Sequence, residues 1–399
     1  MLVALSITQI TSWGVLYYAF PVALADISAD TGWSPAAATA AFSGGLIVSA
    51  VAGIPVGRWL DHHGPRLVMT AGSMLAVPAI AGIALAPTYQ FFVLAWLIAG
   101  VAMAAVFYQA AFAALTRWYG DERVRALTVL TLVAGLASTV FAPLTHQLLE
   151  YFSWRTTYLI LALLLALVTI PLHAFALTPP WVGVAVNSSP GTRRRRRPPP
   201  EVRSLGFLVL AGALTLTAFG LYAASLALIP LLTGRGFSSA LAATTLGLLG
   251  AGQLLGRIGY APLASRTNPA GRTVAIVLAS AVTIALLAAV PGPAGVLVAI
   301  AVLAGAARGA GTLLQATVVA DRWGAERYGT LSGYFAAPIT AAAAIAPWAG
   351  TALADAIGSY PAMFGWLAAL VAGAACLAAV SQQVDFRSSQ SSTPGAGDR

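Results

Sequence analysis

Long apolar runs dominate this sequence of 399 residues and leave it few ways to fold. Twelve such runs can be drawn, each of about 20 residues, which is the length of helix that crosses a bilayer core of about 30 Å. Only 8% of the residues are charged, too few to cover a water-soluble surface of this size. The runs do not alternate in polarity as barrel strands do, so they predict helices. The sequence therefore predicts an all-α membrane protein.

The predicted spans form two groups of six. The first run begins at the N-terminus without a basic segment or a clear cleavage site, so it is interpreted as a span rather than a signal peptide. We predict an N-terminal six-helix bundle at residues 1–177 and a C-terminal six-helix bundle at residues 205–380. Residues 178–204 are predicted to be a cytoplasmic linker, which its prolines and like charges keep from packing, and residues 381–399 a disordered cytoplasmic tail. The spans cover residues 2–24, 36–56, 67–86, 90–115, 126–149, 156–177, 205–232, 239–264, 273–290, 294–320, 330–353 and 360–380.

Arginine supplies all 21 basic residues, and its distribution predicts the orientation. With both termini in the cytoplasm, seventeen arginines lie in cytoplasmic segments and only Arg155 and Arg235 lie in outer loops. Basic residues gather on the cytoplasmic side of membrane proteins, which predicts a multi-pass protein of the cell (inner or plasma) membrane. The net charge of +9 is thus explained by topology and predicts no nucleic-acid partner. The run of five arginines at 193–197 is interpreted as a topology anchor, with binding of anionic lipid headgroups as the alternative.

The two halves resemble each other at a nearly constant offset of 204 residues. Two six-helix halves related by an axis along the membrane normal are typical of the major facilitator fold, with its substrate site near the midplane between the halves. The recurring pairs are Gly32-Trp33-Ser34 with Gly236-Phe237-Ser238, Glu122-Arg123 with Glu326-Arg327, and Ala142-Pro143 with Ala346-Pro347.

The loop between the second and third predicted spans reads GRWLDHHGPR at residues 57–66. It resembles the signature loop of the major facilitator family, G-x-x-x-D-R-x-G-R-R, which latches the outward-facing state in that family. The resemblance implies a conformational latch made of Gly57, Asp61, Gly64 and Arg66.

The physics of this loop agrees with a latch, although a plain tight loop is the alternative. Gly57 permits close approach of a helix, and Gly64 supplies a turn. Asp61 can accept hydrogen bonds from the N-terminus of a neighbouring helix and from arginine. The corresponding loop of the second half is degraded, with Ser265-Arg266 in place of Asp61-His62.

The first 70 residues resemble more narrowly the monocarboxylate porter and oxalate/formate antiporter branch of that family. The resemblance implies a carboxylate substrate bound by an arginine of the eighth span, a role that falls on Arg257. An acid one turn before that arginine is replaced by Gln253, and two lysines of the branch are missing, so coupling to a proton or to an exchanged anion stays open. The matching motifs are Gln9, Trp13-Gly14, residues 17–21, Gly32-Trp33-Ser34 and the loop at residues 57–66.

Arg257 and Arg308 are the charges that lie inside predicted spans, about 12 Å and about 20 Å from the cytoplasmic end. Placing arginine there costs about 2.5–3.5 kcal/mol, so each needs a partner. No acidic residue lies deep in any predicted span, and Asp26, Glu150 and Asp355 all lie at the outer edge. An anionic substrate is the simplest partner, because a guanidinium pairs with a carboxylate through two hydrogen bonds. The alternatives are that Arg257 reaches the cytoplasmic surface and that Arg308 bonds helix carbonyls and Gln or Tyr side chains.

Polar residues in several spans are predicted to line the substrate path, and glycines to make room beside Arg308. The alternative is that the polar residues join helices or lie at the membrane interface. The path residues are Gln9, Tyr17, Tyr108, Gln109, Tyr222, Gln315 and Tyr334, and the glycines are Gly305, Gly309 and Gly311.

No motif indicates an enzyme, a cofactor or a metal site. The sequence has no phosphate loop, no nucleophile motif and no Cys/His spacing of a metal site, and its single cysteine, Cys376, allows no intrachain disulfide. We therefore predict a monomeric secondary transporter that works by alternating access on a small organic anion, such as a mono- or dicarboxylate. An exporter of hydrophobic drugs or metabolites, and a membrane sensor that binds a ligand without flux, are the alternatives.

Overall fold

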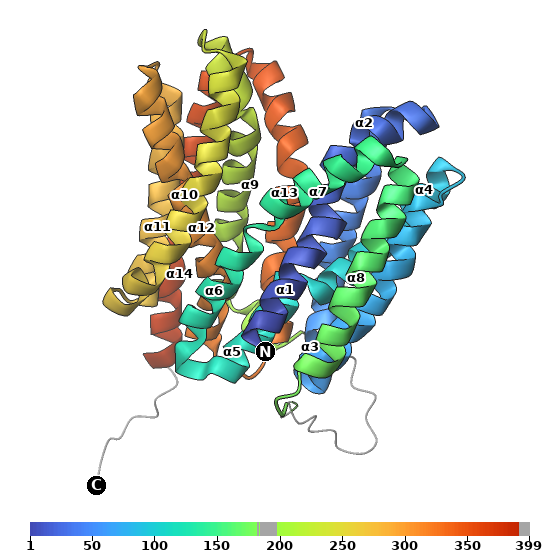
Figure 1. The fold of residues 1–399 in the computed structure, drawn as a ribbon. Coiled ribbons are helices and arrows are strands. Elements are labelled where there is room, and N and C mark those ends of the chain that lie inside the picture. Colours follow the sequence, from blue (N-terminus) through green and yellow to red (C-terminus); the bar gives the residue numbers. More distant parts are fainter. Residues whose placement is uncertain (182, 184–197, 391–399) are drawn as a thin grey trace. The chain divides into compact units, whose positions relative to one another are not determined.

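The computed structural model describes residues 1–181, 183 and 198–390, and these residues form helices and no strand. The predicted all-α fold is confirmed. The helices, coloured along the chain in Figure 1, are α1 (Leu2–Trp13), the π-helix η1 (Gly14–Tyr18), α2 (Ala19–Thr31), α3 (Pro35–Ala84), α4 (Tyr89–Val106), α5 (Tyr108–Tyr119), the 3-10 helix η2 (Gly120–Glu122), α6 (Arg123–Ala134), α7 (Ala137–Tyr151), α8 (Trp154–Ala176), the 3-10 helix η3 (Pro200–Arg203), α9 (Leu205–Gly234), α10 (Ser239–Arg266), α11 (Pro269–Ala289), α12 (Ala294–Trp323), α13 (Tyr328–Ile357) and α14 (Tyr360–Gln390).

Ten helical stretches of the described residues are long and apolar enough to cross a membrane. Two of them are far longer than one crossing needs: Pro35–Ala84 has 50 residues and Tyr89–Tyr151 has 63. At 1.5 Å per residue they extend over about 75 Å and about 95 Å, against a bilayer core of about 30 Å. Each is also interrupted, α3 by the non-helical backbone of Gly64 and the second stretch by η2. Each therefore holds two of the twelve predicted spans.

The recurring Gly-x-Ser motif marks the first loop of each half. Gly32 and Gly236 have positive φ angles of 71° and 85°, which glycine adopts without strain. Two residues later, Ser34 and Ser238 accept a hydrogen bond from the backbone N–H three residues on, which caps α3 and α10. The motif thus ends one helix and begins the next in both halves.

The chain divides into two compact units, Met1–Thr192 with Val319–Ala344, and Arg193–Val318 with Ile345–Arg399. The boundaries fall inside α12 and α13, so the first part of α13 belongs to unit 1. The predicted bundles at residues 1–177 and 205–380 stay a prediction.

The described parts of the predicted linker and tail contain helix and a packed side chain, which the sequence did not predict. α14 continues to Gln390, so the predicted tail at residues 381–399 begins as helix. Within the predicted linker, η3 forms and Trp181 packs against the loop at residues 57–66. The arginine run at 193–197 lies outside the described residues.

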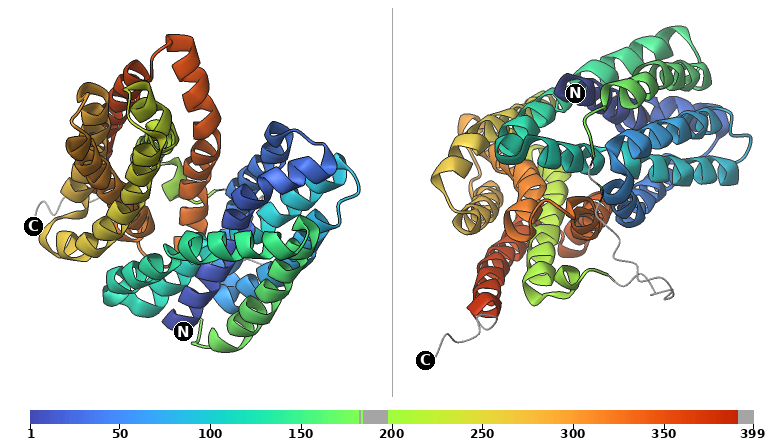
Figure 2. Two further views of the ribbon diagram at one scale, coloured as in Figure 1. Left: turned by 45° about the horizontal axis from the view of Figure 1, so that its top comes forward. Right: turned by 90° about the horizontal axis from the view of Figure 1, so that it is seen from below.

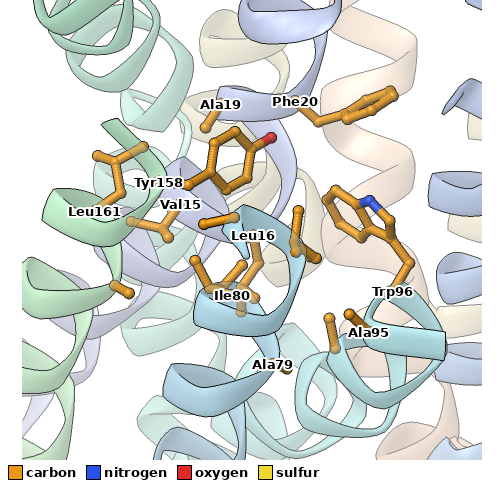
Figure 3. Close-up of a cluster of buried hydrophobic side chains, with 14 of the residues drawn as sticks. Val15, Leu16, Ala19, Phe20, Ala79, Ile80, Ala95, Trp96, Tyr158 and Leu161 are labelled. Atoms are coloured by element: carbon orange, nitrogen blue, oxygen red, sulfur yellow. The ribbon is translucent and has the colours of Figure 1, made fainter. Parts of the chain in front are cut away.

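Unit 1 has an aromatic core where α3 lies beside α4 and α8. Trp96 of α4 is fully buried, with ring centroids 5.3 Å from Phe20 and 5.0 Å from Phe42. Tyr158 of α8 is buried in the same cluster, near Val15 (Figure 3). These buried side chains pack α2, α3, α4 and α8 against one another around η1.

In unit 2, α14 lies beside both α9 and α11, and the three helices can be followed in Figure 2. A Cβ on Gly220 of α9 would lie 2.5 Å from the side chain of Val371 of α14. Glycine is therefore required for this close packing of α9 on α14.

The two arginines that are predicted to lie in outer loops cap helix ends, which gives each a structural role. Arg155 donates to the carbonyl of Ala84, the last residue of α3, at 2.7 Å. Arg235 donates to the carbonyls of Leu287 and Val290, at the end of α11, at 2.8 Å each. The last carbonyls of a helix have no partner within it and carry partial negative charge, so both arginines stabilise a terminus.

Candidate functional site

Four glycines let α10 and α12 of unit 2 touch backbone to backbone. Gly252 and Gly256 on α10 and Gly305 and Gly309 on α12 each form a G-x-x-x-G pair. A Cβ on any of them would lie between 1.9 and 2.2 Å from a carbonyl oxygen of the other helix. Room beside Arg308 is thus confirmed for Gly305 and Gly309, but the prediction was wrong for Gly311, which has nothing within 4 Å of its Cβ position.

Arg308 follows this crossing directly and is half-buried. One guanidinium N–H donates to the hydroxyl of Ser225 at 2.8 Å, and the guanidinium carbon lies 4.2 Å from the ring centroid of Tyr222. Both partners belong to α9, and neither carries a negative charge. No carboxylate of the described residues forms an ion pair with Arg308. Its charge is therefore held in place without being neutralised.

Of the other predicted residues of unit 2, Arg257 and Gln315 lie on α10 and α12, and Tyr222 lies on α9. Arg257 follows Gly256 on α10 and is only 7% exposed, so the described side chain does not extend to open solvent. Gln315 lies on α12, two helical turns beyond Arg308 and on the same face of that helix. The structure brings the ring of Tyr222 on α9 to the guanidinium of Arg308 on α12.

In unit 1 the predicted path residues lie at helix interruptions. Tyr17 belongs to η1, the π-helical segment, and Tyr108 and Gln109 follow the break at Phe107, where ψ is −171°. Gln9 is fully buried and donates to the carbonyl of Val106, the last residue of α4, at 2.6 Å. Irregular backbone at membrane depth is found where it is buried in protein or lines a cavity.

Aromatic rings join the two interruptions. Trp13 stacks on Phe107 with ring centroids 4.1 Å apart and an interplanar angle of 7°. Its ring also lies 5.4 Å from Tyr17 and 5.0 Å from Tyr108. The sequence had marked the two tyrosines but missed Phe107, because nothing in the composition of that run indicates a break.

Asp61 of the signature loop caps α13. Its carboxylate oxygens accept hydrogen bonds from the backbone N–H of Gly329 at 2.9 Å and of Thr330 at 2.6 Å. These are the second and third residues of α13, whose first N–H groups have no partner within the helix. Asp61 is only 2% exposed, and a carboxylate there is further stabilised by the helix dipole. The expected bond to a helix N-terminus is confirmed, whereas the role of a latch stays a prediction.

Glycines bring α3 and α13 together at the same place. A Cβ on Gly57 would lie 2.0 Å from the carbonyl oxygen of Gly329, and one on Gly333 would lie 2.5 Å from that of Gly53. The predicted close approach at Gly57 is confirmed. Gln109 lines a small pocket beside this crossing, with Gly53, Gly57 and Gly329 among its other walls.

Of the remaining residues of the signature loop at 57–66, some contact other parts of the protein and one is exposed. Gly64 adopts a φ of 80°, as the predicted turn requires, but Arg66 is exposed, and its side chain forms no hydrogen bond or ion pair within the described part of the chain. Arg58, which sequence reasoning did not select, donates to the hydroxyl of Tyr334 and lies over its ring. Tyr334, predicted to line the substrate path, is thus tied to the signature loop.

An ion pair accompanies these contacts. Arg123, the first residue of α6, lies 2.8 Å from Asp321 in the last turn of α12. Asp321 is 8% exposed at its side chain, so the pair is partly shielded from water. The described residues include no group of three His, Cys, Asp or Glu side chains that could hold a metal ion.

The fold and these contacts define a class, the polytopic helical membrane transporters with a signature loop after the second span. Residues 5–296 match the model of the Major Facilitator Superfamily, and the chain belongs to this family. Members of this family are membrane transporters of small-molecule substrates and not enzymes, so the chain is a membrane transporter by family.

Similar proteins agree with this assignment. An MFS-type transporter of Gibberella moniliformis (strain M3125 / FGSC 7600) is 25% identical over 346 residues, which are 84% of this chain and 79% of that protein. The structure of human MFSD10, described as an organic anion transporter, matches with a TM-score of 0.72 and 16% identity over 94% of this chain and 98% of that one. The E. coli fucose:proton symporter FucP matches with a TM-score of 0.68 and 15% identity over 95% and 98%. At such identities the structures show the fold alone.

Proposed function

We propose that this protein is a secondary active transporter that works by alternating access and carries a small organic anion, such as a mono- or dicarboxylate. The observation that carries the proposal is Arg308, a membrane arginine whose described partners are a hydroxyl and an aromatic ring. Charged residues inside membrane segments are rare and mark substrate or ion pathways.

Arg308 is suited to a carboxylate because its guanidinium is held in one orientation by its contacts and keeps N–H groups that are not hydrogen-bonded within the described residues. Ser225 accepts one guanidinium N–H, and Ser225 in turn donates to the carbonyl of Leu221 at 2.6 Å. Tyr222 fixes the plane of the guanidinium from one side. The other N–H groups form no hydrogen bond within the described residues, so they can pair with two carboxylate oxygens.

Arg257 is the second proposed substrate residue. The α10–α12 crossing fixes both arginines, since each is the immediate neighbour of one of its glycines. A dicarboxylate would use both guanidinium groups and a monocarboxylate one. The description of MFSD10 as an organic anion transporter is in line with this charge, at the level of a shared fold.

The aromatic cluster of unit 1 favours a second candidate, a neutral cargo such as a sugar, a drug or a hydrophobic metabolite. Trp13, Tyr17, Phe107 and Tyr108 offer ring faces, and Gln109 lies next to them in sequence. FucP, described as a fucose:proton symporter, shares the fold. Nothing in this cluster carries a charge, so it would not distinguish an anion from a neutral molecule.

We further propose that Asp61, Gly57, Gly64 and Arg66 form the latch of the transport cycle. On the arginine asymmetry, both termini face the cytoplasm and the latch lies on the cytoplasmic side of the cell membrane. The protein works as a monomer, coupled to a proton or to an exchanged anion. The contacts of Asp61 with α13 form in one state of the cycle and break in the other.

Counterflow of radiolabelled lactate, oxalate and succinate in proteoliposomes tests the cargo. Arg308→Gln should raise the KM of at least one of these by about tenfold to hundredfold, since a hydrogen bond to a charged group contributes about 1.5–3 kcal/mol. Arg203→Gln removes the same charge from an exposed position next to α9 and should leave KM unchanged.

The outcomes separate the candidates. Loss of carboxylate counterflow in Arg308→Gln but not in Arg203→Gln supports an organic anion. Flux of a neutral sugar or drug that survives Arg308→Gln supports the neutral cargo. Binding of a ligand with no flux of any compound would point to a sensor.

A further inference from the structure

The segment that follows α8 is anchored on the signature loop by one tryptophan. The indole N–H of Trp181 donates to the backbone carbonyl of Asp61 at 3.1 Å. The guanidinium carbon of Arg117 lies 4.2 Å from the centroid of the Trp181 ring, and Trp118 meets the same ring edge-on at 6.2 Å. Trp181 is therefore held by the end of α5 on one side and by the loop on the other.

The ring also covers the turn that breaks α3. A Cβ on Gly64 would lie 2.8 Å from Cγ of Trp181, so only glycine fits beneath the indole. Two residues after the tryptophan, a Cβ on Gly183 would lie 2.6 Å from the carbonyl oxygen of His62. The chain after α8 thus contacts the loop at Trp181 and again at Gly183.

The carbonyl that Trp181 binds has lost its helical partner. In a regular helix the carbonyl of residue 61 would accept from the N–H of residue 65, but Pro65 has none. The non-helical backbone of Gly64 interrupts the ladder at the same point. A buried carbonyl without a donor is costly, and the indole N–H supplies the missing donor.

We propose that Trp181 is a positioning residue for the latch. By fixing the backbone of Asp61, it keeps the carboxylate aimed at the N–H groups of Gly329 and Thr330. The proposal rests on the latch function proposed above, and it assigns to the first residues of the linker a part in the transport cycle.

Accessibility of a cysteine beside the latch tests this. Ser332 is 7% exposed and lines the small pocket next to Gly57 and Gly329, so Ser332→Cys reports opening of the α3–α13 crossing. The background is Cys376→Ser, since the native cysteine is exposed. Labelling by N-ethylmaleimide is measured on the full chain in membranes and normalised to folded protein.

Trp181→Phe keeps the ring and removes the N–H. It should raise the labelling rate about two- to tenfold, the range of one lost neutral hydrogen bond. Asp61→Asn should raise it further, and the double variant should label no faster than Asp61→Asn alone, because both changes act through one carboxylate. Trp366→Phe, at a position 66% exposed on α14, should label as the parent does.

The outcomes distinguish the two proposals. If Asp61→Asn raises labelling and Trp181→Phe does not, or if their effects multiply, Trp181 has no positioning role while the latch stands. If Asp61→Asn leaves labelling unchanged, the latch is wrong and the role of Trp181 falls with it. Should Trp181→Phe not fold, Trp118→Leu, which removes the ring packed edge-on against the indole, must raise labelling by itself, and an unchanged rate contradicts the proposal.

Discussion

The crossing of α3 with α4 in unit 1 and the crossing of α10 with α12 in unit 2 occupy corresponding places in the repeat. A Cβ on Gly100 would lie 2.1 Å from the carbonyl oxygen of Gly45, and one on Gly305 would lie 2.0 Å from that of Leu249. The first pair and the second pair are related by the offset of 204 to 205 residues. The duplicated chain has therefore kept the same close contact of backbones in both units.

The chemistry beside the two crossings has diverged. At the offsets that align the two crossings, 204 for α10 and 205 for α12, the places of Arg257 and Arg308 are taken in the first half by Gly53 and Met103. Among the described residues, guanidinium groups lie beside the crossing of unit 2 and not beside that of unit 1, and the interrupted helices with aromatic rings around them lie in unit 1. Both units share the close helix packing that glycines allow. The guanidinium groups that are proposed to bind a charged cargo belong to unit 2.

The loop at residues 57–66 and the corresponding loop of unit 2 also differ, but here the charged group that reaches another helix belongs to unit 1. In unit 1, Asp61 reaches out of its loop to the N-terminus of α13. In unit 2, where Ser265 stands at that position, Arg272 turns inward and donates to the carbonyls of Ala264 and Thr267 at 3.3 Å each. The second loop is thus closed on its own helix end and offers no carboxylate for a latch.

The largest expected effect concerns the shared glycines. Gly100→Ala and Gly305→Ala should each lower stability by about 3 kcal/mol or more, because the added Cβ collides with a backbone oxygen that cannot rotate away. Size-exclusion chromatography and thermal unfolding in detergent measure this. Gly311→Ala adds the same atom to α12 in open space, and equal stability of Gly305→Ala and Gly311→Ala would show that the crossing is not required.

The next largest expected effect is that substitutions at Asp61 and Arg308 change different kinetic constants, the turnover and the KM. Asp61→Asn should change the turnover of transport by about tenfold to hundredfold with little change in KM, since it weakens charged hydrogen bonds that form in only one state. Arg308→Gln should do the reverse. Kinetics of counterflow in proteoliposomes decide, with Ser265→Ala as the matched change in the other loop, and a rise in KM for Asp61→Asn would break the comparison.

Arg272→Gln should reduce stability without altering transport per folded molecule. Arg272 is 4% exposed, and its loss leaves helix-end carbonyls without a donor, at a cost of about 1.5 kcal/mol. Thermal unfolding and counterflow are compared on the same preparation. An effect on turnover as large as that of Asp61→Asn would mean that the second loop also gates transport.

The smallest effects on stability are expected at Arg155 and Arg235, the two arginines that donate to helix-end carbonyls. Arg155→Gln and Arg235→Gln should each destabilise by about 1 kcal/mol, the size of a charge at a helix C-terminus, in both units alike. Thermal unfolding measures the difference from the parent. Loss of transport at full stability would instead assign one of these arginines to the substrate path.

The sequence predicted the features that follow from composition and short motifs. Apolar runs gave the spans, the Gly-x-Ser motif gave helix ends, and Gly57, Gly64 and Asp61 were placed correctly because each meets a need of the local backbone. The π-helical turn at η1 and the break at Phe107 were not foreseen. Pro21 was a local signal for the first, since it has no N–H to donate to the carbonyl of Tyr17 in η1. No proline lies at Phe107, whose ring stacks on the distant Trp13.

Contacts between distant residues account for the other differences. Trp181 follows two prolines in a segment that resembles a linker, and it packs because it meets the Asp61 carbonyl that Pro65 leaves without a donor and the side chains of Arg117 and Trp118. Tyr334 was predicted to line the path, but its partner Arg58 is 276 residues away in sequence. No local pattern reports such a pairing.

Thermal unfolding of the purified protein with acetate, lactate, oxalate and succinate, each against sodium chloride of equal ionic strength, tests the central claim most directly. If Arg308 provides the charge that binds the cargo, at least one carboxylate will raise the unfolding temperature of the parent and of Arg203→Gln but not of Arg308→Gln, because a ligand stabilises the state that binds it. An equal rise in Arg308→Gln would contradict the account, as would stabilisation by a neutral sugar or drug with none by any carboxylate.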